Sequence, residues 1–348
     1  MDEIIGRSSQ ILSPPIVLVT EPTFEVNRIE QHARVLQFRP ANDKFFSKEE
    51  QQKWIRENIG QAKVLYMMPS TKVDVPLLEM AKVLKAVVTI SVGYDHIDIA
   101  ECARRGIRMG FAGPILTEAT AETAVALLLA VSRRVPESAQ MAKEGKWPIN
   151  WSPKFCIGKA LEGSTVGLFG MGRIGLSVAE KLIPFHPLEI IYHNRKANQI
   201  YENRFRYVSF DELIESSDFL IISASVSEQT KGLFRSEVFE RMKSDAVLVN
   251  ISRGCVVNSN DLYEALSGGK LGGAALDVTE PEPLPPGHLL YTLPNCVITP
   301  HIGSANNVAR KQMMETGQAN VLAALKEQEM PSPIQYSKEM PSPIPYSK

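Results

Sequence analysis

The chain has 348 residues, of which 44% are hydrophobic and 22% are charged, the composition of an ordinary globular protein. Its 38 basic and 39 acidic residues give a formal net charge of −1, so no basic surface for nucleic acid or an anionic membrane is predicted. The four cysteines lack a C-x-x-C or metal-binding spacing, so we expect free thiols and no metal. Neither a signal-peptide core nor a run of ~18 apolar residues is evident. We therefore expect a cytoplasmic protein with two domains and no membrane span.

Short apolar segments alternate with helical patterns in the first third of the chain. Helices are predicted to start at the capping residues Ser47, Asp74 and Asp98. The predicted strands cover residues 16–19, 34–38, 64–67 and 86–90. Because such short strands alternate with helices, they indicate parallel β/α units. Residues 11–115 are thus predicted to form one α/β domain.

A long helical pattern at residues 117–134 is apolar nearly all round. Such a helix has to be buried, either between domains or against a second subunit. A loop follows at residues 143–157 and contains Trp147 and Trp151.

The same β/α rhythm then repeats, which predicts a second domain over residues 116–303. Its strands are predicted at residues 166–169, 189–193, 207–209, 219–223, 247–251, 273–278 and 296–299. Its helices are expected near residues 174–183, 236–243 and 259–267.

The end of the chain contains a helix and a repeat. The amphipathic helix near residues 304–330 is expected to pack back on the first domain. Residues 329–338 and 339–348 are near-identical ten-residue copies, and we expect a disordered extension over 331–348 because so short a repeat builds no core. The predicted fold class is α/β, with a flavodoxin-like substrate domain, a doubly wound dinucleotide-binding domain and a cleft between them.

The strand at 166–169 runs into the motif Gly170-x-Gly172-x-x-Gly175 and then into a helical pattern. The first glycine permits the tight turn, and the second lets the backbone approach a pyrophosphate. The third lets the helix pack closely on the strand, while the free N–H groups of the helix face the anion. An ordinary glycine turn is the alternative, but the strand and helix on either side favour a dinucleotide site that includes Arg173 and Ile174.

The strand at 189–193 ends without a carboxylate, although NAD-binding folds usually have one there for the adenosine ribose. Asn194, Arg195 and Lys196 follow instead. The two cations suit the dianionic 2′-phosphate, around which the Arg195 guanidinium can fork. The residues therefore favour a site for the 2′-phosphate of NADPH over a merely solvated turn. NADH is the weaker alternative as cofactor.

Three late segments each place a polar residue just beyond a predicted strand, where sites in open α/β sheets gather. These residues are Arg253, Glu282 and His301. Reduction of a 2-oxo acid needs a proton donor and a cation, which histidine and arginine supply. Glu282 would hold His301 in one tautomer and stabilise its protonated form. Each residue alone has an ordinary structural explanation, but their shared position favours catalysis.

Five motifs together make the chain resemble the D-isomer-specific 2-hydroxyacid dehydrogenases, and most closely their glyoxylate/hydroxypyruvate reductase branch. The resemblance covers residues from about 15 to 330. The motifs are SVGYDHID (91–98), GMGRIG (170–175), NISRG (250–254), LDVTEPEPLP (276–285) and TPHIGS (299–304).

The resemblance implies a role for individual residues. Arg253, Glu282 and His301 would be catalytic, with His301 as proton donor. The backbone N–H groups of Val92 and Gly93 would bind the substrate carboxylate. Arg253 and His301 would also bind the substrate, and Asp277 would lie beside the nicotinamide and the substrate. The implied cofactor-binding residues are Gly170, Gly172, Arg173, Ile174, Gly175, Asn194, Arg195, Lys196, Ser225, Ile251, Asp277 and Gly303.

The resemblance also implies a homodimer through the helix at 117–134. It implies that Trp151 reaches the partner's active site, although an interface or core position is as good an explanation. His186 stands where relatives often have glycine, which could shift the turn before the strand at 189–193.

The implied activity is NADPH-dependent reduction of glyoxylate to glycolate and of hydroxypyruvate to D-glycerate. A phosphoglycerate or lactate dehydrogenase is one alternative. A corepressor that binds dinucleotide without turnover is another, because such proteins retain a similar Arg/Glu/His set.

Overall fold

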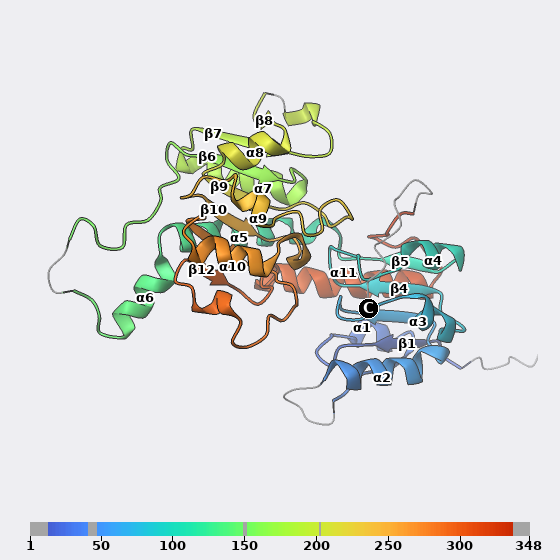
Figure 1. Ribbon diagram of the computed structural model, residues 1–348. Coiled ribbons are helices and arrows are strands. Elements are labelled where there is room, and N and C mark those ends of the chain that lie inside the picture. The colour runs from blue at the N-terminus through green and yellow to red at the C-terminus, as the bar shows by residue number, and fades with distance from the viewer. Residues whose placement is uncertain (1–12, 41–46, 149–151, 202, 337–348) are drawn as a thin grey trace, which may run out of the picture. The chain divides into compact units, whose positions relative to one another are not determined.

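The computed structural model describes residues 13–40, 47–148, 152–201 and 203–336. The chain divides into two compact units, one made of residues up to Gly113 together with those from Lys311, the other running from Pro114 to Arg310. Each unit is built on a parallel sheet with flanking helices, which confirms the predicted α/β class (Figure 1).

The sheet of the first unit has the order β2-β1-β3-β4-β5 among the described residues. Its strands are β1 (Ile16–Val19), β2 (Arg34–Gln37), β3 (Val64–Met67), β4 (Ala86–Thr89) and β5 (Arg108–Gly110). Its helices are α1 (Asn27–Glu30), α2 (Lys48–Asn58), α3 (Val75–Met80) and α4 (Ile99–Arg104). This order is that of flavodoxin-like sheets, as the sequence predicts.

The second unit has a seven-stranded sheet in the order β12-β11-β10-β9-β6-β7-β8, counted over the described part of the chain. The strands are β6 (Thr165–Phe169), β7 (Glu189–His193), β8 (Arg206–Tyr207), β9 (Phe219–Ile222), β10 (Val247–Asn250), β11 (Gly273–Leu276) and β12 (Cys296–Ile298). The helices of this unit are α5 (Thr117–Ser132), α6 (Val135–Lys143), α7 (Arg173–Leu182), α8 (Phe210–Ser216), α9 (Ser236–Phe239) and α10 (Ser259–Ser267), and the first residues of α11 (Asn307–Leu325) also belong to it. The strand order reverses between β6 and β9, which is where dinucleotides bind in doubly wound folds.

Helix α5 is a core helix of the second unit. By length and composition Gly113–Ser132 could cross a membrane, so the expectation that no stretch is apolar enough for this was wrong. Its small residues Ala121 and Ala124 are fully buried, and Leu128 lies with them in a cluster that includes residues of β6 and α7. Core helices of globular proteins pass the same composition test.

Helix α11 starts in the second unit, and its later turns belong to the first (red in Figure 1). Gly317 lets the helix approach Tyr66, because a Cβ there would lie 2.4 Å from the tyrosine oxygen. Asn320 is fully buried and donates from Nδ2 to the Phe111 carbonyl at 3.0 Å.

The expectation of a disordered extension from residue 331 is wrong for residues 331–336. Pro333 forms an antiparallel bridge with Gly110 of β5, and the Ile334 N–H donates to the Met109 carbonyl at 2.8 Å. Met330 and Ile334 are both buried. The edge of β5 offers backbone groups that need partners, and the first repeat supplies them. The second repeat, from residue 339, lies outside the described residues.

Several elements differ from the sequence expectation. The long helical pattern breaks at Arg134, which is left-handed (φ 53°), and α6 follows with a proline in its first turn. Ser209 caps α8 by accepting from the Glu212 N–H, so β8 is shorter than predicted. His186 is also left-handed (φ 54°), the conformation that favours the glycine of relatives, yet β7 starts at Glu189 as predicted.

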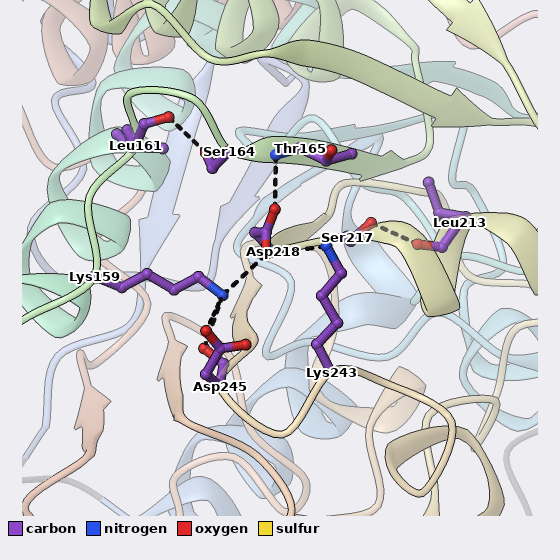
Figure 2. A network of polar contacts seen from close by, with 9 residues as sticks. All are labelled: Lys159, Leu161, Ser164, Thr165, Leu213, Ser217, Asp218, Lys243 and Asp245. Carbon is purple, nitrogen blue, oxygen red and sulfur yellow. Dashed lines mark hydrogen bonds and ion pairs between the residues drawn. The ribbon is translucent and has the colours of Figure 1, made fainter.

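A largely buried carboxylate ties the amino-terminal ends of the second sheet together (Figure 2). Asp218 accepts from the Thr165 N–H of β6 at 2.8 Å. It also pairs with Lys159 at 3.1 Å and with Lys243 at 3.0 Å. Burial opposes ionisation of Asp218, but these three donors outweigh it and lower the pKa.

Candidate active site

The glycine turn after β6 has the geometry of a dinucleotide loop. Gly170 has φ 103°, and a Cβ there would lie 2.5 Å from the Ala224 nitrogen. A Cβ on Gly175 would lie 2.2 Å from the Gly170 oxygen, whereas one on Gly172 would meet no described atom within 4 Å. The first and third glycines therefore close the turn, and the second faces open space from which an anion can approach.

Helix α7 starts directly after this turn, and no side chain of the described residues caps it. The first-turn N–H groups, including those of Arg173 and Ile174, are therefore directed toward the open side of the glycine loop. A pyrophosphate fits this position, since helix N-termini bind anions. These residues fit the nicotinamide dinucleotide that the sequence predicts.

Asn194 closes the other side of the loop. Its Oδ1 accepts from the Met171 N–H at 2.7 Å, and its Nδ2 donates to the Met171 carbonyl at 3.3 Å. The side chain thus holds the glycine turn against the end of β7. Arg195 and Lys196 come next and are exposed, and neither forms an ion pair with the described residues.

Arg253 lies in a turn that Asn250 organises at the end of β10. The fully buried Asn250 donates from Nδ2 to the Arg253 carbonyl at 2.9 Å. Its Oδ1 accepts from the N–H of Ser252 at 3.0 Å and from the hydroxyl of Ser252 at 2.9 Å. Both ends of the amide therefore fix the backbone from which Arg253 projects.

The loop that carries Glu282 packs directly on this turn. A Cβ on Gly254 would lie 1.9 Å from the carbonyl carbon of Thr279, so only glycine fits there. The Thr279 hydroxyl donates to the Pro281 carbonyl at 2.9 Å, and its N–H donates to Glu282 Oε2 at 3.4 Å. The close approach at Gly254 thus packs the two loops against each other, and the Thr279 bonds fix the shape of the loop that carries Glu282.

His301 and Glu282 form a close pair, with 2.6 Å between Nδ1 and Oε1. Burial would raise the pKa of Glu282, but the hydrogen bond and charge of His301, the Thr279 N–H and the Arg253 guanidinium together lower it. Glu282 is thus an ionised partner for the imidazole at neutral pH. The structure brings Arg253, Glu282 and His301 together at the ends of the adjacent strands β10, β11 and β12.

Asp277 builds the His301 loop. Its carboxylate accepts from the Thr299 hydroxyl at 2.6 Å and from the N–H groups of Ile302 and Gly303, both at 2.8 Å. Asp277 is only 2% exposed. A direct contact of this residue with substrate or cofactor stays a prediction, but its position explains how the loop is fixed.

The backbone of His301 is left-handed (φ 53°), which is uncommon for a residue with a side chain. Its N–H donates to the Asp277 carbonyl at 2.9 Å. The Asp277 bonds on both sides of the imidazole therefore hold His301 in a conformation that a free loop would rarely adopt.

The remaining cofactor predictions lie at the same edge of this sheet. Ile251 is buried after β10, and its N–H donates to the Ile222 carbonyl at 3.2 Å. Ser225 is exposed after β9, and Gly303 is buried against Asp277. Trp151 lies outside the described residues.

The turn at Ser91–Gly93 lies in the first unit, after β4. Among the described residues, no acceptor pairs with the N–H groups of Val92 and Gly93. The carbonyl of Ser91 accepts from the Ala112 N–H at 3.0 Å, and the Gly93 carbonyl accepts from the Ser91 hydroxyl at 2.6 Å. With these carbonyls bonded internally, the turn offers N–H donors suited to an anion.

Asn250, Thr279 and Thr299 stand in the motifs that the sequence offers, but the sequence assigns no positioning role to them, although each fixes the loop of a predicted catalytic residue. The signal available was that Asn and Thr at strand ends often bond to nearby backbone. That signal does not identify the partner.

A doubly wound sheet with a glycine loop at its switch point, and an Arg/Glu/His group at its strand ends, define a nicotinamide-dinucleotide-dependent oxidoreductase. The family model for the D-isomer specific 2-hydroxyacid dehydrogenase NAD binding domain matches residues 125–303. The chain belongs to this family.

Similar proteins include the glyoxylate reductase/hydroxypyruvate reductase of Mus musculus, 45% identical over 268 residues, which are 76% of this chain and 81% of that protein. The protein of the same description from Homo sapiens is 43% identical over 285 residues, covering 81% and 87%. The solved TT0316 protein of Thermus thermophilus is 39% identical with a TM-score of 0.84, covering 92% and 100%. The NADPH-dependent glyoxylate/hydroxypyruvate reductase of Sinorhizobium meliloti, in complex with NADP and malonate, is 30% identical with a TM-score of 0.78, covering 92% and 97%.

Proposed function

We propose that this protein reduces glyoxylate to glycolate and hydroxypyruvate to D-glycerate with NADPH. The observation that carries the proposal is the 2.6 Å pair of His301 and Glu282, with the Arg253 charge acting on the same carboxylate. The names of the relatives from Mus musculus and Sinorhizobium meliloti support this choice of substrates.

Arg253 and His301 act on the substrate in different ways. The Arg253 guanidinium binds the 2-oxo acid in two-pronged fashion and polarises the reacting carbonyl. His301 is the proton donor, and because Glu282 occupies Nδ1, the proton leaves from Nε2 to the developing alkoxide. Bound NADPH supplies the hydride. The backbone N–H groups of Val92 and Gly93 bind the substrate carboxylate.

Replacement of His301 tests the proton donor. His301→Ala should lower kcat for hydroxypyruvate by roughly 10²–10⁴-fold, the range typical of general acid catalysis. NADPH binding, followed by the change in its fluorescence, should be unaltered. Turnover close to that of the wild type would mean that another group donates the proton.

The coenzyme preference rests on the exposed Arg195 and Lys196 after β7. The wild type should show a higher kcat/KM with NADPH than with NADH, and the Arg195→Ala/Lys196→Ala variant should lose that advantage. Lys82→Ala, which removes an exposed cation from the first unit, is the control. Equal use of both coenzymes by the wild type would refute the NADPH preference.

We further propose a homodimer through α5, because Val125 and Leu129 leave part of its apolar surface incompletely buried. Light scattering after gel filtration should give twice the 38.6 kDa chain mass. A monomer at micromolar concentration would contradict this proposal.

A further inference from the structure

A chain of hydrogen bonds runs beneath the Ser91–Gly93 turn in the first unit. It links the His96 Nε2 to Thr89 Oγ1 at 3.2 Å, and Thr89 Oγ1 to Ser91 Oγ at 2.9 Å. Ser91 Oγ then donates to the Gly93 carbonyl at 2.6 Å. Thr89 is fully buried and His96 is 4% exposed, so water does not compete for the bond between them.

The direction of every bond follows from the last one. The Gly93 carbonyl only accepts, so it takes the single hydroxyl proton of Ser91. Ser91 must then accept from Thr89, whose own proton is used in that bond. Thr89 therefore accepts from His96, which fixes the tautomer with a proton on Nε2. Each donor in such a chain polarises the next, which strengthens the bonds.

His96 is itself held in place by the backbone. Its carbonyl accepts from the Val73 N–H at 2.9 Å, and the Asp98 N–H donates to the Val73 carbonyl at 2.8 Å. The backbone from which the imidazole projects is therefore fixed at the start of the chain. The other end of the chain is the peptide after Gly93, within the turn that offers the two N–H donors.

We propose that His96, Thr89 and Ser91 are positioning residues that hold the Val92 and Gly93 N–H groups in place for the substrate carboxylate. This inference rests on the proposed function of that turn. The chain occupies the Gly93 carbonyl with the Ser91 hydroxyl, so that this acceptor does not compete with an anion for the donors of the turn. The three side chains act through the turn, so their effect falls on substrate binding alone.

Thr89→Val tests the inference because it keeps the side-chain shape and removes the hydroxyl in the middle of the chain. We expect KM for hydroxypyruvate to rise about tenfold, with kcat and KM for NADPH within about twofold of wild type. This pattern is that of an interaction equal in ground and transition states. Thr89→Ser restores the hydroxyl and should return KM to within about threefold of wild type.

Thr20→Val is the matched control. Thr20 is also fully buried in the first unit, but its hydroxyl has no hydrogen-bond partner among the described residues, so the same substitution breaks no bond. Its kinetics should equal those of the wild type. If Thr89→Val does not fold, Ser91→Ala is measured in its place, with the same expected rise in KM.

The results separate this inference from the proposed function. A wild type that reduces hydroxypyruvate, with a Thr89→Val variant whose KM equals that of Thr20→Val, would overturn the positioning role alone. A lowered kcat with unchanged KM for hydroxypyruvate would also overturn it, because that pattern indicates an interaction made only in the transition state and not one that binds the substrate. A wild type that reduces no 2-oxo acid would overturn both.

Discussion

The pairing of Glu282 with His301 predicts how activity depends on pH when its charge is removed. Glu282→Gln keeps an oxygen that accepts from Nδ1 and therefore keeps the tautomer. It removes the negative charge that stabilises the protonated imidazole. Because the proton donor works only while it is protonated, activity with the variant should be lost at a lower pH than with the wild type.

The size of the shift follows from the geometry. The 2.6 Å separation is that of a strong charge-assisted hydrogen bond, which contributes about 1.5–3 kcal/mol. The two side chains are 48% and 42% exposed, so solvent screening favours the lower end of that range. A loss of about 1.4 kcal/mol is a factor of ten, which moves the falling limb of kcat/KM by about one pH unit.

The lowered pKa of Glu282 decides whether this carboxyl can cause the falling limb of kcat/KM. A carboxyl whose pKa lies below the ordinary value near ~4.3 stays ionised at higher pH, and its charge is lost only as pH falls through the lowered pKa. Glu282 therefore stays ionised between about pH 5 and 9, and a limb in that range does not come from its own titration.

The assay is NADPH oxidation with hydroxypyruvate from about pH 5 to 9. The variant should lose about tenfold in kcat/KM above the limb and approach the wild type below it. Glu280→Gln changes an exposed glutamate of the same loop and should leave the profile unchanged. An unmoved limb, or an equal loss at every pH, would refute the role assigned to the Glu282 charge.

Two further predictions concern stability, measured by urea unfolding. Asp218→Asn removes the charge at the centre of the network in Figure 2 and should cost about 2 kcal/mol at pH 7. Because the pKa of Asp218 is lowered, this difference in the free energy of unfolding should be full above about pH 4 and shrink as pH falls further. Asp245→Asn, whose side chain is 72% exposed, is the control and should have little effect. A difference between Asp218→Asn and wild type that is independent of pH would contradict the reasoning. Ile334→Asp places a charge in the buried contact with β5 and should cost about 3 kcal/mol, whereas Gln335→Asp, on an exposed neighbour, should be neutral. Equal stabilities of these last two variants would show that the first repeat does not hold the β5 edge.

The meeting of Arg253, Glu282 and His301 was predictable because it depends on local patterns. Each follows an apolar strand, and the carboxyl ends of parallel strands lie along one edge of a sheet. Consecutive strands β10, β11 and β12 are also neighbours in space, so the chain order alone brings the three residues together.

What escaped prediction depends on partners that are distant in sequence. Nothing near Asp277 indicates that its carboxylate accepts from Gly303, 26 residues later. In the same way, a proline-rich repeat with no core of its own gives no sign that Pro333 completes the edge of β5. Local pattern identifies which residue types are present, whereas such pairings are decided by how the whole chain folds.

Asn194, at the end of β7, is informative both in the sequence and in the structure. The sequence shows that Asn194 is not a carboxylate, and this supports an NADP-type site. The structure adds a physical reason, because the Nδ2 of Asn194 donates to the Met171 carbonyl at 3.3 Å while Oδ1 accepts from the same residue. An aspartate would set a second oxygen against that carbonyl and would weaken the hold on the glycine loop. The amide is therefore needed by the loop itself, and under the proposed NADPH preference recognition of the adenosine end passes to the two cations that follow.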